Sequence, residues 1–88
     1  MDRYLLTSTH TAEDCRMAIQ HFREFHSGFL THFEWGCYDN DHSAYAFVEA
    51  ESHEAAKMAV PPIFRDKTKV VKLRHFKPAA GNDPMHDK

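Results

Sequence analysis

One segment constrains the fold of this chain more than any other, namely Ser43–Ala50 (SAYAFVEA). Small apolar residues at positions 44, 46, 48 and 50 alternate with Tyr45, Phe47 and more polar residues. A period of two residues indicates a β-strand whose two faces meet different surroundings. The segment therefore predicts a sheet with one face packed beneath helices and an opposite face that carries aromatic side chains.

The rest of the chain supplies the partners that such a strand needs. Three further segments are short, apolar and rich in β-forming residues, and they are predicted to be strands: residues 3–9, 33–38 and 69–76. Thr11 is placed to cap a first helix that ends near Gly28, and its apolar stripe includes Phe29 and Leu30. Ser52 is placed to cap a second helix over residues 53–60, which the following prolines end.

These elements follow one another as β-α-β-β-α-β. This order predicts an α+β fold of the ferredoxin-like type, a sandwich of an antiparallel four-stranded sheet with two helices on one face. A four-residue loop between the second and third strands pairs Tyr38 with Ser43, so that Trp35 and Cys37 share the helix-facing side with Ala46.

The size and composition of the chain bound its domain organisation and its class. Its 88 residues, 42% of them hydrophobic, suffice for one core, so residues 1–76 are predicted to be a single domain and the polar tail 77–88 to be disordered. No apolar stretch has the length of a membrane span or a secretory signal, which predicts a cytoplasmic protein without a membrane partner. The formal net charge of −2 supplies no positive field for nucleic acid.

Two mirrored spacings, His10-x4-Cys15 and Cys37-x4-His42, contain both cysteines of the chain. In the predicted topology the ends of the first and second strands, the start of the third strand and the start of the first helix share one edge of the sheet. Two thiolates and two imidazoles form a familiar tetrahedral site for zinc, and copper or nickel can use a similar set. The spacing therefore predicts a site for zinc or another transition metal at His10, Cys15, Cys37 and His42.

Simpler interpretations of the same four residues remain open. Each cysteine falls on a core-facing position, where a free thiol often serves as a small hydrophobic group, and histidines beside turns are ordinary surface residues. A reducing cytosol favours thiols or metal ligands over a stapling disulfide, although a single reversible Cys15–Cys37 bridge is an alternative. A redox thiol pair or a Cys-His nucleophile would use the same residues.

The helix-free face of the sheet calls for a cover, because monomers rarely expose a large apolar patch. A second copy of the chain is the predicted cover, and the ligand pocket or dimer face is assigned to Glu34, Trp35, Tyr45 and Phe47. The run Tyr45-Ala46-Phe47-Val48 is similar to the aromatic core of an RNA-recognition motif. Its flanking positions lack the basic, glycine and closing aromatic residues, and Glu34 and Glu49 would repel phosphate. A homodimer is thus favoured and nucleic acid is not expected.

Three short runs carry a resemblance across residues 3–76, namely His10-Thr11-Ala12-Glu13-Asp14-Cys15, Glu34-Trp35-Gly36-Cys37, and Asp41-His42 followed by Tyr45. Together they resemble small prokaryotic ferredoxin-like proteins of unassigned function, of the dimeric α/β-barrel type. The resemblance implies the fold and commonly a homodimer, and it implies no established activity.

The leading hypothesis is therefore a small homodimeric ferredoxin-like protein with a His2Cys2 metal site. One alternative is a small-molecule-binding protein or enzyme of the dimeric α/β-barrel type without metal, in which Tyr45, Trp35, Glu34 and His10 contact a flat ligand. Another alternative is an RNA-binding module. The sequence names no reaction.

Overall fold

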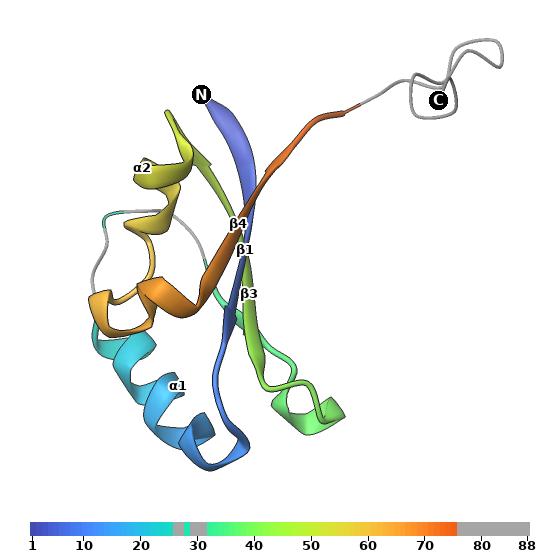
Figure 1. The fold of residues 1–88 in the computed structure, drawn as a ribbon, viewed down its shortest axis with the longest axis vertical. Coiled ribbons are helices and arrows are strands. Elements are labelled where there is room, and N and C mark those ends of the chain that lie inside the picture. Colours follow the sequence, from blue (N-terminus) through green and yellow to red (C-terminus); the bar gives the residue numbers. More distant parts are fainter. Residues whose placement is uncertain (26–27, 29–31, 76–88) are drawn as a thin grey trace, which may run out of the picture.

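The computed structural model describes residues 1–25, 28 and 32–75. Its elements in chain order are β1 (Asp2–Thr9), η1 (Ala12–Asp14), α1 (Cys15–Glu24), β2 (Glu34–Trp35), η2 (Cys37–Asp39), β3 (Ser43–Ala50), α2 (His53–Lys57), η3 (Pro62–Lys67) and β4 (Thr68–Leu73), where η marks a short 3₁₀ helix. The four strands form one antiparallel sheet in the order β2-β3-β1-β4. Both α-helices lie on the same side of this sheet (Figure 1). The predicted α+β class with a four-stranded antiparallel sheet is confirmed.

The core lies between the sheet and the helices, and alternation along the strands builds it. On β1, Tyr4 and Leu6 are buried, and they lie opposite Val48 and Ala46 of β3. Ala18 of α1, Ala56 of α2 and Phe64 of η3 complete the buried cluster from the helical side. Small residues on β3 leave room for the aromatic rings that pack against them. Leu5 and Thr7 consequently lie on the helix-free face, which settles the orientation of the first strand.

The second strand is shorter than predicted, and its register differs from the predicted one. The strand covers only Glu34–Trp35 instead of residues 33–38, and Trp35 pairs with Ala44 rather than Ala46. The amide of Gly36 bonds to the Ser43 carbonyl, and the chain then turns into η2, so Cys37 lies in a 3₁₀ turn and not on a strand. Trp35 nevertheless lies on the predicted, helix-facing side of the sheet, because a shift of two residues in strand register keeps a side chain on the same face.

Both helices begin as predicted but end earlier. Oγ1 of Thr11 accepts a hydrogen bond from the Asp14 amide, and Oγ of Ser52 accepts one from the Ala55 amide. The α1 helix ends at Glu24, because Phe25 adopts extended backbone angles, and α2 ends at Lys57. The predicted stripe residues Phe29 and Leu30 and the predicted tail 77–88 lie outside the described residues. Within the described part of the chain, no helix has the length and apolar character that crossing a membrane requires.

Candidate metal and disulfide site

Four separate segments bring the predicted metal ligands together at one edge of the sheet. His10 follows β1, Cys15 begins α1, Cys37 begins η2, and His42 precedes β3. Their potential ligand atoms all lie within 4.8 Å of one another. The convergence predicted from the topology is therefore confirmed, and it joins residues up to 32 positions apart in the sequence.

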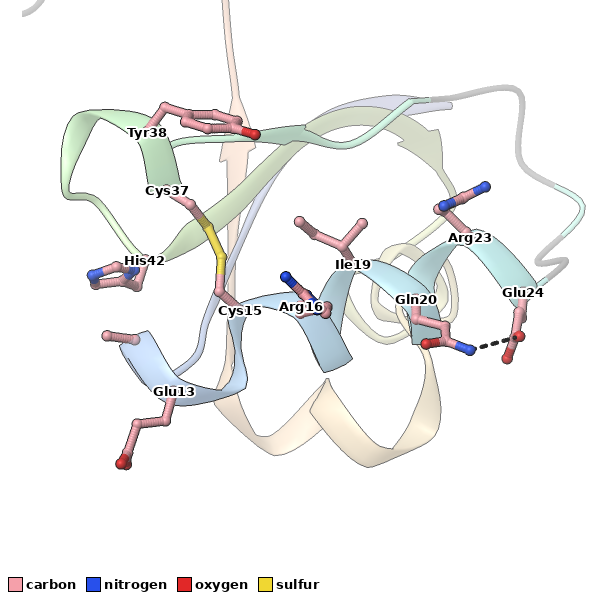
Figure 2. Close-up of a pocket in the computed structure, with 11 residues that line it drawn as sticks. Glu13, Cys15, Arg16, Ile19, Gln20, Arg23, Glu24, Cys37, Tyr38 and His42 are labelled. Carbon is pink, nitrogen blue, oxygen red and sulfur yellow. Dashed lines mark hydrogen bonds between the residues drawn. A yellow bond between two sulfur atoms is a disulfide. The ribbon is translucent and has the colours of Figure 1, made fainter.

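The two cysteines in this cluster form a disulfide. Cys15 and Cys37 are bonded through their sulfur atoms, and their Cα atoms lie 7.1 Å apart. Figure 2 shows the bridge linking the first turn of α1 to η2, with the ring of His42 beside it. The expectation of free thiols or metal ligands in place of a disulfide is thus wrong for this state of the protein. The reason is topological, because the fold holds both sulfurs at the same point.

A tight loop between β2 and β3 positions Cys37 and His42. The carbonyl of Gly36 accepts hydrogen bonds from the amides of Asp39 and Asp41, both at 2.9 Å. Asn40 closes the turn with a positive φ of 64°, a conformation that asparagine tolerates better than most residues. A side chain at Gly36 would place its Cβ 2.8 Å from the Asp41 carbonyl oxygen. Glycine is therefore needed here for the close approach of two backbone segments.

His10 turns inward toward the disulfide. Its side chain is buried, and its Nε2 atom lies 3.4 Å from Sγ of Cys37. Its amide donates a hydrogen bond of 3.0 Å to the His42 carbonyl, which ties the end of β1 to the loop. The pKa of His10 is lowered, first because burial disfavours the charged ring and then because His42 is close, while Asp14 acts in the opposite direction. A neutral imidazole is the form that binds metal.

His42 carries the clearest sign of an unmet interaction. Its Nδ1 atom is buried and has no hydrogen-bond partner among residues 1–25, 28 and 32–75. Its ring centroid lies 6.0 Å from that of His10, on the same side of the disulfide cluster. A buried polar atom without a partner costs about 1–3 kcal/mol, so such atoms are uncommon and call for an explanation. A metal ion within the four-residue cluster would supply one.

A solvent-open groove of about 760 Å³ runs from the disulfide along α1. Both cysteines and His42 form one end of it, and helix residues spaced by three or four positions line the rest: Arg16, Ile19, Gln20 and Arg23. In Figure 2 the side chains of Ile19 and Arg23 rise from α1 toward the segment that carries Tyr38, whereas that of Glu13 points away. The disulfide is therefore reachable from solvent. The spacing of Arg16 and Arg23 is visible in the sequence, but the spacing alone does not indicate that these residues line a groove.

The residues assigned to a ligand pocket or dimer face divide between the two sides of the sheet. Trp35 faces the helices, with its ring 5.1 Å from that of Phe22 and 5.7 Å from that of His10. Glu34 and Tyr45 form a cross-strand pair on the helix-free face, where the Phe47 side chain is 51% exposed. Trp35 and His10 thus cannot share one flat surface with Glu34 and Tyr45.

Tyr45 also supports the site loop from the outside. Its hydroxyl donates a hydrogen bond to Oδ2 of Asp41, the residue before His42. This bond raises the pKa of Tyr45, with desolvation as a smaller cause in the same direction. The sequence offered only a weak signal for this contact, namely the spacing of four residues across a turn.

No protein-family model, curated protein or solved structure matches this chain. A functional assignment therefore depends on the geometry of the site.

Proposed function

We propose that this chain is a metal-binding protein in which His10, Cys15, Cys37 and His42 hold a zinc-type ion when the cysteines are reduced. The disulfide is then the metal-free, oxidised form of the same site. One observation carries the proposal: four ligand atoms of the right chemical types, from four segments, lie within 4.8 Å of one another. The proposed ferredoxin-like fold is supported by two features: β1 lies between β3 and β4 in the sheet, and strands and α-helices follow one another as β-α-β-β-α-β.

The existing distances are close to those that tetrahedral zinc requires. Zinc–sulfur bonds of about 2.3 Å and zinc–nitrogen bonds of about 2.05 Å place sulfur and nitrogen ligands about 3.6 Å apart. Nε2 of His10 and Sγ of Cys37 are already separated by 3.4 Å. The two sulfurs would have to move to about 3.8 Å from each other once their bond is broken. Side-chain rotation can provide most of this change, because the Cα atoms are already 7.1 Å apart.

The number of ligands indicates the kind of chemistry that such an ion would perform. Two thiolates and two imidazoles fill a tetrahedral coordination sphere, which leaves no position for the activated water of a zinc hydrolase. A metal bound here would therefore serve in metal storage, in metal sensing or in stabilising the fold. The buried Nδ1 atom of His42 would gain a partner, provided that this nitrogen is the one that binds.

Cobalt binding tests this function directly. Protein without a histidine tag is reduced, freed of metal and titrated with Co²⁺, with about one equivalent expected to bind and to give the absorption of a tetrahedral thiolate complex. His42→Ala should weaken binding by at least about tenfold, whereas substitution of the exposed His75, which follows β4, as His75→Ala should leave binding unchanged. Octahedral or substoichiometric binding by the reduced protein would refute the proposal.

We further propose that two copies of the chain pair through the helix-free face of the sheet. Leu5, Val71 and the half-exposed Phe47 form an apolar surface across three neighbouring strands. Phe47→Glu should convert a dimer into a monomer in sedimentation experiments, and Ile63→Glu, at an exposed apolar residue of η3, is the matched control. A monomer for the unmodified chain at high concentration would exclude this arrangement.

A further inference from the structure

We infer that the groove along α1 binds small anionic thiols, which reduce the Cys15–Cys37 disulfide by thiol–disulfide exchange. The inference goes beyond metal binding, because the exchange needs no metal. It joins two observations on the same surface: an accessible disulfide at one end of a groove of about 760 Å³, and two arginines along its wall.

The arginines give the groove its preference for anions. Arg16 and Arg23 are exposed, lie two helical turns apart on α1 and form no ion pair with any other residue among those the structure describes. Two carboxylates also belong to the groove lining. The side chain of Glu13 points away from the groove in Figure 2, and Glu24, nine positions after Cys15, keeps its charge while it accepts a hydrogen bond of 3.4 Å from Gln20. A carboxylate or sulfonate on a thiol that approaches the disulfide would therefore pass close to two unpaired guanidinium groups.

The arrangement around the bridge assigns the order of bond changes. A thiolate attacks Sγ of Cys15, a sulfur–sulfur bond forms between them, and the Cys15–Cys37 bond breaks with its electron pair left on Sγ of Cys37. The departing thiolate lies 3.4 Å from Nε2 of His10, which can donate a hydrogen bond to it. Cys15 stands at the amino end of α1, where the helix dipole favours a thiolate in the later steps.

A second thiolate completes the reaction. It attacks the sulfur that the first thiol contributed to the mixed disulfide, which frees the Cys15 thiolate and releases the symmetrical disulfide of the small thiol. In total, two thiols lose two electrons and the protein disulfide gains them, while the two protons of the thiols pass through solvent to the protein sulfurs. The product is the protein with both cysteines reduced. In this form the two thiols and the two histidines of the cluster are available as the proposed metal ligands.

The test compares two thiols of different charge under metal-free conditions with a chelator present. Oxidised protein is mixed with 2-mercaptoethanesulfonate or 2-mercaptoethanol, the reaction is quenched with acid, and the reduced fraction is measured by alkylation and mass spectrometry. Rates are expressed per thiolate. Coulomb attraction in water at a distance of about 7 Å favours the anion about threefold for each arginine, so roughly a tenfold preference is expected at low ionic strength. The preference should disappear in concentrated salt.

Variants make this preference specific to the groove. Arg16→Gln with Arg23→Gln should bring the ratio of the two rates to about one, whereas Arg74→Gln with Lys69→Gln removes the same charge from exposed positions on and after β4 and should leave the ratio unchanged. Equal rates for both thiols in the unmodified protein would overturn the inference, as would a preference that survives the double arginine variant. A small-thiol adduct found on Cys37 instead of Cys15 would overturn the assigned order of attack. Because the exchange is measured without metal, each of these outcomes can be interpreted even if the reduced protein fails to bind metal.

Discussion

Reduction of the disulfide should destabilise the metal-free protein by an amount that follows from the loop it closes. Cys15 and Cys37 are separated by 22 positions, and a crosslink over that length removes about 3 kcal/mol of chain entropy from the unfolded state. For a domain of this size each kcal/mol moves the melting temperature by about 4–8 °C. The reduced, metal-free protein should therefore melt roughly 12–24 °C below the oxidised protein.

Zinc should reverse this loss in the reduced protein, because it crosslinks the same two segments and binds only the folded chain. A metal concentration about a thousandfold above the dissociation constant adds about 4 kcal/mol of stability by mass action. Reduced protein with zinc should thus melt at or above the temperature of the oxidised protein. The oxidised protein should respond little, since its sulfurs cannot bind as thiolates.

Thermal unfolding followed by circular dichroism provides the assay. Four samples are compared, namely oxidised and reduced protein, each with chelator or with zinc. The control is Cys15→Ser with Cys37→Ser, which should melt near the reduced, metal-free protein and respond to neither reductant nor zinc. If zinc fails to raise the melting temperature of the reduced protein, the coupling between the bridge and the metal site is refuted.

Three further predictions concern the loop and the titrating groups. Gly36→Ala should destabilise the protein by about 1–3 kcal/mol in urea unfolding and weaken cobalt binding, because its Cβ would lie 2.8 Å from the Asp41 carbonyl; unchanged binding would show that the loop tolerates the shift. The lowered pKa of His10 means that the unfolded chain takes up a proton first, so stability should fall as pH drops below about 6.5 and level off below the folded pKa, and His10→Gln should flatten this profile. Asp41→Asn should lower the pKa of Tyr45 in an ultraviolet titration, since the charged acceptor of its hydroxyl proton is lost; an unaltered pKa would exclude this bond as the cause.

The periodicity of the sequence predicted the parts of this fold that depend on local alternation and capping. Alternation along β3 identified the buried face, and Thr11 and Ser52 identified the helix starts, because each of these features acts through neighbours close in the sequence. The end of β2 depended on backbone hydrogen bonds from the loop to Gly36, which no side-chain pattern encodes. That is why Cys37 was expected on a strand and lies in a turn.

The sequence was enough to predict that the four residues of the candidate site lie close together, but it could not predict whether the two cysteines form a disulfide. The order of the elements alone places His10, Cys15, Cys37 and His42 at one edge, so topology sufficed to bring them together. Whether two adjacent thiols form a disulfide depends on differences of less than about 1 Å in the positions of their sulfur atoms and on the redox potential of the surroundings. The spacing of residues in the sequence specifies neither quantity. The groove required the same three-dimensional information, because its two walls come from α1 and from the loop around Tyr38.

Under the proposed function, the disulfide and a bound metal would be alternative crosslinks between the same two parts of the fold. The disulfide links the amino end of α1 to the turn at η2, and a metal held by the same cysteines would do the same, so the sheet and the core need not rearrange when one replaces the other. The difference between the two forms would be confined to the four side chains. Among the described residues, Nδ1 of His42 has no hydrogen-bond partner in the disulfide form, and a bound metal would give it one. A site built in this way would couple metal affinity to thiol redox state without a large conformational change. It follows that oxidation should release metal while leaving the far-ultraviolet spectrum unaltered, and a large spectral change on release would contradict this account.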